Sequence, residues 1–162
     1  MTRLTIKRKA VGAVGASIFV VSLYVSVFAE TVKITVPALV SFAVPNVSNN
    51  ATGTPNPTTV SFSSLSVTSG HTLRISVKAD NDFTPPSGTA IPASKVSWVT
   101  SSPSNGTGTN GTLSKTVYGQ LFQSTVTKTN GSIQVIWTLG APGVGIRSGA
   151  HTLTLRWKLE SI

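Results

Sequence analysis

Few residues in this sequence carry groups that could do acid–base or metal chemistry. The sequence has four Asp and Glu residues, and Asp80 and Asp82 are the only close pair. The segment Asp80-Asn81-Asp82 could offer oxygen ligands to a hard cation such as calcium, but it lacks the further acidic residues and the fixed spacing of a known calcium loop. Asn and Asp also favour turns, so a turn after the preceding strand explains the segment equally well. We therefore expect no metal site.

The combinations that nucleophilic or glycosidic catalysis requires are also missing. The two histidines, His71 and His151, have no cysteine or further histidine beside them to build a zinc site. Serine is abundant, but no Gly-x-Ser-x-Gly segment occurs, and no two carboxyls are singled out as a glycosidase pair. The glycine-rich run 140–145 lacks the lysine and the strand-to-helix context of a phosphate loop. We expect no enzymatic activity, no catalytic residue and no cofactor.

Aromatic side chains and asparagines give weaker indications of glycan chemistry. Trp98, Trp137 and Trp157 could stack on sugar rings if they were exposed. Trp137 and Trp157 lie on the apolar faces of predicted strands, which favours core packing, whereas Trp98 lies on a short strand next to a loop and stays ambiguous. Five Asn-x-Ser/Thr sequences fall in predicted loops or turns and could accept glycans. They begin at Asn46, Asn50, Asn105, Asn110 and Asn130.

Charge and cysteine content restrict the function further. The chain carries a formal charge of +9 and contains no cysteine, so a disulfide framework and thiol chemistry are excluded. Four of the thirteen basic residues precede the first apolar run, and a chain beginning at Glu30 would keep a net charge of +5. The remaining positive charge is scattered rather than gathered in a stripe or a motif. We therefore expect no nucleic-acid partner.

Residues 1–29 have the three-part layout of a secretory signal peptide. A basic start, MTRLTIKRKA, precedes the apolar run VGAVGASIFVVSLYVSVF, and the small residue Ala29 ends the segment. Cleavage before Glu30 would place the protein outside the cell or on its surface, with membrane contact only through the leader. Because the apolar run approaches membrane-spanning length, a retained anchor is an alternative. A cut after Ala10 is another, since KRKAVGAVGASIFVV resembles a prepilin leader.

From residue 30 onward the apolar pattern is that of short β-strands separated by Gly-, Pro- and Asn-rich loops. In Thr72–Asp80, apolar and polar residues alternate cleanly, which indicates one buried and one solvated face. Further strands are predicted in Thr59–Val67, Lys95–Thr100, Leu113–Tyr118, Gln120–Lys128, Ser132–Leu139 and His151–Leu159. Loops are predicted in Asn46–Thr58, Asn81–Ser94, Ser101–Thr112 and Gly140–Gly149. The dipeptide Asn130-Gly131 predicts a hairpin with a type I′ turn.

The stretch Thr31–Pro45 is the longest alternating segment, with an apolar residue at every even position from Val32 to Val44. One strand of this length would extend about 43 Å at about 3.3 Å per residue, against a usual length of about 17–20 Å. Pro37 cannot donate to a β-ladder, so we predict two strands. We expect Ala38–Val44 to join the chain's own sandwich. Thr31–Val36 either crosses to the opposite sheet or pairs with a neighbouring molecule.

These elements together predict an all-β protein. No stretch after the leader shows helical periodicity. We expect residues 30–162 to form a single immunoglobulin-like antiparallel β-sandwich of about seven or eight strands after the hydrophobic leader.

The segments TVPALVSFAV and SGAHTLTLRW resemble the first and last strands of secreted fimbrial or spore-coat-U-type β-sandwich subunits. Those families have a Val-Pro opening strand and a Gly-x-Tyr closing strand. Here Gly149-Ala150-His151 takes the closing position, with His151 in place of tyrosine, and the family's cysteines are absent. The resemblance implies assembly by strand donation, in which a segment of one subunit completes the sheet of the next.

The expected function is therefore that of a secreted or cell-surface structural or adhesive protein, with a filament subunit as its specific form. Its partners would be copies of itself or other cell-surface proteins, and glycans are a further candidate. The alternative is a secreted carbohydrate-binding module. That alternative requires exposed aromatic residues, such as Trp98, Tyr118 and Phe122, in a row on one open face.

Overall fold

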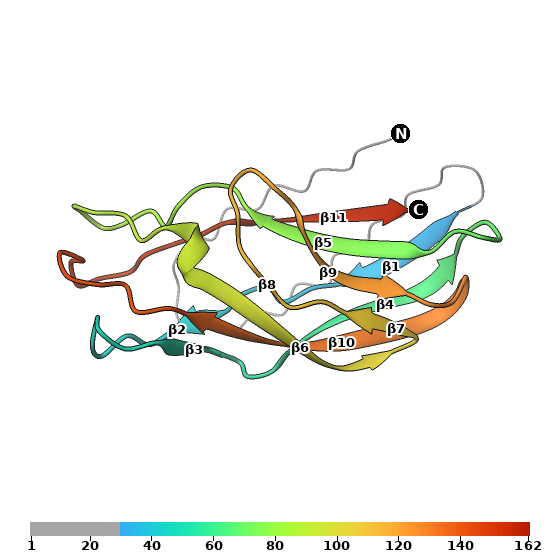
Figure 1. Ribbon diagram of the computed structural model, residues 1–162, viewed down its shortest axis with the longest axis horizontal. Helices are drawn as coiled ribbons and strands as arrows, with labels where there is room; N and C mark the ends of the chain where they lie inside the picture. Colours follow the sequence, from blue (N-terminus) through green and yellow to red (C-terminus); the bar gives the residue numbers. More distant parts are fainter. Residues whose placement is uncertain (1–29) are drawn as a thin grey trace.

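The computed structural model describes residues 30–162, and the predicted leader with its alternative cleavage sites lies outside them. The described residues form two antiparallel sheets that pack face to face (Figure 1). The predicted all-β sandwich is confirmed. The sheets contain seven and four strands, more than predicted, because several strands are only two to four residues long.

The larger sheet is built around its longest strand, β10 (Lys128–Leu139). Along one side of β10 run β4 (Thr58–Ser66) and β3 (Ala51–Thr54), one after the other. Along its other side runs β6 (Val96–Ser104), which follows a 3-10 turn, η1 (Ala93–Lys95). The remaining strands of this sheet are short and lie outside these: β1 (Thr31–Thr35), β2 (Ser41–Phe42) and β8 (Gly111–Thr112).

The smaller sheet has the order β11-β5-β9-β7 and covers the other side of the core (Figure 1). Its strands are β5 (Leu73–Ala79), β7 (Gly106–Gly108), β9 (Gly119–Ser124) and β11 (Leu155–Ser161). The two middle strands, β5 and β9, bury their inward side chains almost completely, and Ile75, Val77 and Leu121 are at most 1% exposed. Aromatic rings join the two sheets, since Phe62 of β4 and Phe122 of β9 lie 5.5 Å apart between centroids.

The opening stretch is divided at Pro37, as predicted. β1 pairs with β4, where Ile34 lies opposite Phe62, and β2 pairs with β3, where Phe42 lies opposite Gly53. The expected crossing of the first half to the opposite sheet is wrong, because β1 joins the same sheet of its own chain as β2. The physical reason is that apolar residues occupy the even positions on both sides of Pro37. Both halves can therefore lie along one edge of the larger sheet with their even-numbered side chains toward the core. The pairing of the first half with a neighbouring molecule stays a prediction.

The predicted Asn130–Gly131 hairpin is wrong. β9 and β10 belong to different sheets, and Asn130 and Gly131 lie inside β10. The pairing of β10 with β4 shifts register between Thr129 and Gly131, with Thr129 at φ 146°. The side chain of Asn130 accepts a hydrogen bond from the backbone N–H of Ser64 on β4, at 3.1 Å. A dipeptide typical of turns therefore forms a β-bulge, because its asparagine bonds to a neighbouring strand.

The stretch Ser101–Thr112 was predicted to be a loop, and this is also wrong. It contains the end of β6 and all of β7 and β8. Its glycines let the backbone lie directly on the core. A Cβ on Gly108 would lie 2.3 Å from Cδ1 of Ile133, and one on Gly111 would lie 2.4 Å from Cζ2 of Trp98.

Three smaller predictions also differ from the structure. The segment 113–118 forms no strand; instead, Leu113 is buried and its backbone N–H donates to the carbonyl of Val96. The predicted loop Asn46–Thr58 contains β3. The last strand begins later than predicted, at Leu155, although Trp157 faces the core as expected.

Candidate functional site

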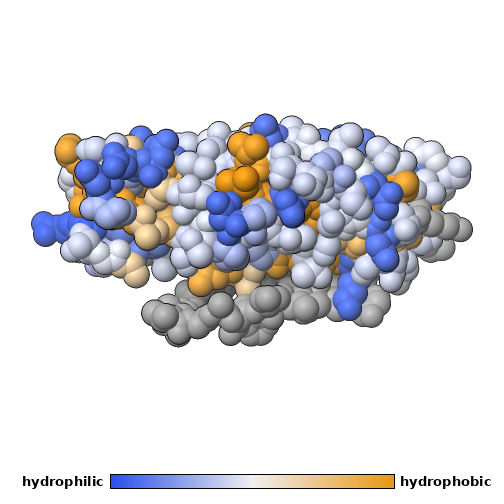
Figure 2. All heavy atoms as spheres, turned by 90° about the horizontal axis from the view of Figure 1, so that it is seen from below, coloured by the Kyte–Doolittle hydropathy of each residue, from blue (hydrophilic) through white to orange (hydrophobic). Residues whose placement is uncertain are grey.

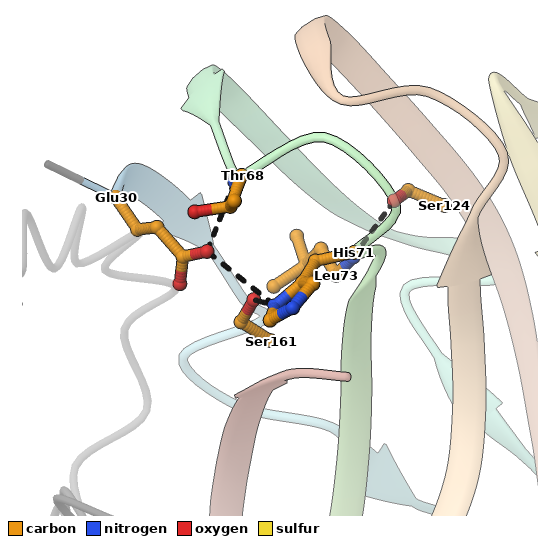
Figure 3. Close-up of polar contacts among 6 residues, drawn as sticks. All are labelled: Glu30, Thr68, His71, Leu73, Ser124 and Ser161. Atoms are coloured by element: carbon orange, nitrogen blue, oxygen red, sulfur yellow. Dashed lines mark hydrogen bonds and ion pairs between the residues drawn. The ribbon is translucent and has the colours of Figure 1, made fainter. Parts of the chain in front are cut away.

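A group of polar contacts lies where the two ends of the described chain meet. We call Glu30, Thr68, His71 and Ser161 the terminal cluster (Figure 3). Glu30 precedes β1, Thr68 and His71 lie between β4 and β5, and Ser161 ends β11. The backbone N–H of Thr68 donates to Oε1 of Glu30 at 2.9 Å, and Oγ of Ser161 lies 3.0 Å from Nδ1 of His71. The cluster therefore joins both ends of the described chain to the β4–β5 connection.

Electrostatics keep the carboxylate of this cluster ionised. The hydrogen bond from the backbone N–H of Thr68 lowers the pKa of Glu30, and contacts with Ser161 and His71 act in the same direction, against the opposing effect of burial. Oε1 of Glu30 lies 3.6 Å from Nδ1 of His71. Glu30 is thus an anion that fixes a turn and faces an imidazole.

A serine, a histidine and a carboxylate suggest a catalytic triad, but the geometry excludes it. A triad uses both imidazole nitrogens, one facing the nucleophile and the other facing the acid. Here Ser161 and Glu30 both approach Nδ1 of His71. The imidazole cannot relay a proton between them, and the His71 side chain is 50% exposed. The contacts of the terminal cluster hold the start of β1, the β4–β5 connection and the end of β11 together.

The two close carboxylates do not act as a pair. Asp80 forms an ion pair with Arg156 of β11. Asp82 accepts a hydrogen bond of 2.6 Å from Nζ of Lys115 and one of 2.8 Å from the backbone N–H of Ala93. The Lys115 contact is the main cause that lowers the pKa of Asp82, and the Ala93 N–H adds to it. In residues 30–162, no group of three or more potential His, Asp or Glu ligands could hold a metal ion.

The second histidine lies apart from the terminal cluster. Nε2 of His151 contacts the backbone carbonyl of Arg147 at 2.9 Å, within the loop that precedes β11. The structure therefore does not bring the two histidines, which the sequence singles out for chemistry, into one site.

The tryptophans belong to the core. Trp98 and Trp137 are each 2% exposed and Trp157 is 7% exposed, which confirms the expectation for Trp137 and Trp157 and resolves the ambiguity of Trp98. Phe122 is 1% exposed. The aromatic row that a carbohydrate-stacking face requires is therefore absent from the described structure, because only Tyr118 of its three expected members reaches the surface.

Tyr118 lies in a shallow groove on the outer face of the smaller sheet. The groove has a volume of about 410 Å³, and side chains of β5, β9 and β11 line it. Nζ of Lys78 lies 5.2 Å and Nζ of Lys158 lies 5.6 Å from the centroid of the Tyr118 ring. The sequence does not reveal this groove, although the alternation in Thr72–Asp80 predicts a solvated face on the strand that carries Arg74.

A second surface feature runs along the side of the sandwich where the two sheets have their edge strands β1 and β11. The contacts of the terminal cluster place the start of β1 beside the end of β11 (Figure 3). Inward side chains of these edges pack against the core but stay partly exposed. They include Val32, Val36, Leu155 and Leu159. We call this side the edge seam.

The five asparagines of the possible glycosylation sequences are exposed, and each makes a side-chain hydrogen bond. Asn130 lies in β10 rather than in the predicted turn. Asn105 donates through Nδ2, the atom that would carry a glycan, to the carbonyl of Asn130 at 2.6 Å. These contacts give the asparagines structural roles in turns and between strands.

No protein-family model matches the chain, and no curated protein or solved structure is significantly similar to it. Among residues 30–162, no helix is long and apolar enough to cross a membrane. The surface seen from below Figure 1, the side of β6 and β10, shows strongly hydrophilic residues in separate groups between paler ones (Figure 2).

Proposed function

We propose that this chain is an exported structural subunit of a cell-surface or extracellular assembly, in which β1 is exchanged between neighbouring subunits. The observation that carries the proposal is the placement of β1. It lies at the outer edge of the larger sheet, pairs with β4 alone, and is separated from β2 by residues 36–40, which form no strand. A change of backbone conformation in this short connection would let β1 of one subunit occupy the same place on the β4 of another.

Two further features support this proposal. The side chain of Ile34 is 3% exposed between the sheets, so β1 contributes an apolar anchor that a neighbour's sheet would bury equally well. The edge seam leaves Val32 of β1 and Leu155 and Leu159 of β11 partly exposed, and exposed sheet edges are templates for pairing with another chain. The leader predicted from the sequence would bring the chain to the place where such an assembly forms.

The chemistry of the described residues agrees with a structural role. The carboxylates singled out by the sequence are engaged by Arg156 and Lys115, and the serine–histidine–glutamate contacts hold the chain ends. These groups already have intramolecular partners that stabilise the fold.

The absence of cysteine allows a direct test of β1 exchange. Lys33 and Ser63 are opposite each other in the β1–β4 register, so the double variant Lys33→Cys/Ser63→Cys would carry the only two cysteines of the chain. The protein is concentrated under reducing conditions and then oxidised. We expect non-reducing electrophoresis to show a ladder of disulfide-linked subunits, because each bond joins the β1 of one subunit to the β4 of the next.

The single variants Lys33→Cys and Ser63→Cys serve as controls, since each can form at most a dimer. A double variant that oxidises completely to a monomer, at concentrations where particles are visible by negative-stain electron microscopy, would exclude β1 exchange as the mode of assembly. A protein that stays monomeric at every concentration would contradict the proposed structural function itself.

A further inference from the structure

The groove around Tyr118 has a polar and cationic character that the proposed assembly does not use. It is lined by Arg74, Ser76, Tyr118, Gln120, Lys158 and Glu160, and it lies on the outer face of the four-stranded sheet, away from the β1–β4 pairing. The register explains how these residues meet. On β5, Ser76 lies opposite Lys158 of β11 on one side and opposite Gln120 of β9 on the other. Three strands therefore present one continuous polar row.

Cations gather around this row. Arg74 and Lys78 project from β5, Arg156 and Lys158 from β11, and Lys115 from the connection before β9. Asp80, Asp82 and Glu160 are the acidic residues nearby, so the face keeps two positive charges in excess. Nε of Arg74 is buried and has no hydrogen-bond partner among the described residues. An anionic group in the groove could form ion pairs with these excess cations.

Tyr118 has a specific effect on this charge. The ammonium groups of Lys78 and Lys158 both lie within 6 Å of its ring centroid, and the negative face of an aromatic ring attracts such cations. The ring holds two like charges near each other at the groove. It is therefore not a free platform for stacking a neutral sugar, which was the basis of the carbohydrate-binding alternative.

We propose that the Tyr118 groove binds an acidic polysaccharide whose sugar rings carry carboxylates. The carboxylates would form charge-assisted hydrogen bonds with Arg74 and Lys158, which line the groove, and with Lys78, which lies over the Tyr118 ring. Gln120 would bond to a sugar hydroxyl, whereas Ser76 is only 3% exposed. The open shape of the groove suits a polymer lying across the sheet. The carboxylates of Asp80, Asp82 and Glu160 between the cations oppose a nucleic acid, whose closely spaced phosphates require an uninterrupted basic stripe.

The test measures the binding of trigalacturonate to the full-length protein by calorimetry or NMR titration. The neutral trisaccharide maltotriose is the uncharged comparison. We expect binding of trigalacturonate that weakens as salt is raised, and no binding of maltotriose. The double variant Lys78→Gln/Lys158→Gln should lose about tenfold or more in affinity, as expected when charge-assisted bonds are removed. Glu160→Gln should bind more tightly than the native protein, because Lys158 loses its intramolecular anion.

A charge-matched control separates the groove from general electrostatic attraction. Lys33→Gln/Lys95→Gln removes the same charge from β1 and η1, outside the groove, and should keep its affinity within about twofold of the native value. An equal loss in both double variants would overturn the proposal, as would the absence of trigalacturonate binding. Tighter binding of duplex DNA than of trigalacturonate, at the same salt concentration, would also overturn it. None of these outcomes bears on the disulfide ladder that tests β1 exchange.

Discussion

The indole Nε1 of Trp137 donates a hydrogen bond of 2.9 Å to Oγ1 of Thr58, and the two side chains are 2% and 3% exposed. The Thr58 hydroxyl in turn donates to the carbonyl of Val135 at 3.1 Å. One threonine on β4 therefore satisfies two buried polar groups of β10. This explains how a tryptophan with a polar N–H can lie at the centre of the core.

Replacement of Thr58 by valine should destabilise the fold. The substitution keeps the shape of the side chain but leaves the Trp137 N–H without its partner in the core, which costs about 1–3 kcal/mol. We expect this loss in the free energy of unfolding measured with urea. Thr59→Val on the same strand is the matched control, because Thr59 is exposed, and it should change the free energy little. Equal effects of the two substitutions would contradict the structural role of the bond.

Gly111→Ala should destabilise the protein by overpacking. A Cβ at this position would lie 2.4 Å from Cζ2 of Trp98, a buried ring that cannot move without disturbing the core. We expect a loss of about 1–3 kcal/mol in thermal or urea unfolding. Gly140→Ala is the comparison, since its nearest neighbour would be 3.3 Å away and its effect should be smaller. If the two variants were equally stable, the packing of β8 against Trp98 would be wrong.

Ile34→Ala should also reduce stability, by about 2–5 kcal/mol, because it removes buried apolar volume from β1. Lys33→Ala, on the outward side of the same strand, should have a small effect. The measurement is urea unfolding of dilute protein, in which each chain must use its own β1. A dilute Ile34→Ala variant with native stability would show that β1 is not docked in its own sheet.

Acid should release the terminal cluster. Because the pKa of Glu30 is lower in the folded protein than its ordinary value of 4.5, the ionised carboxylate stabilises the fold above that pH. This contribution is lost as the pH falls through the folded-state pKa. Glu30→Gln should therefore lower the unfolding temperature at pH 7, and the difference from the native protein should shrink at pH values below the folded-state pKa. A difference that stays constant with pH would rule out the charge of Glu30 as its cause.

Regular alternation made the positions of several strands predictable from the sequence. In Thr72–Asp80, for example, the apolar side chains are buried as expected, although Ser76 on the opposite face is buried as well. The break at Pro37 follows from the missing N–H of proline. Asn130–Gly131 was mispredicted because its local turn chemistry is overridden by a contact with Ser64, which is distant in sequence. A pattern within one strand cannot show which other strand will supply such a partner.

The glycine-rich stretch was mispredicted and the groove was not predicted, for a related reason. Ser101–Thr112 reads as a loop, but its glycines are required by Trp98 and Ile133, whose positions depend on the tertiary fold. The Tyr118 groove combines residues of three strands that are far apart in sequence. Their outward positions could be predicted, whereas their meeting around one aromatic ring depends on strand register.

The terminal cluster also has a mechanical consequence. Because Glu30 and Ser161 lie beside each other, tension applied between these two residues of one subunit would enter at a single end of the sandwich. It would peel β1 from β4 and β11 from β5 one hydrogen bond at a time. In an exchanged assembly, tension would instead pull the β1 of one subunit lengthwise along the β4 of its neighbour. All the hydrogen bonds of that antiparallel ladder would then resist the load together, since they lie perpendicular to the strands.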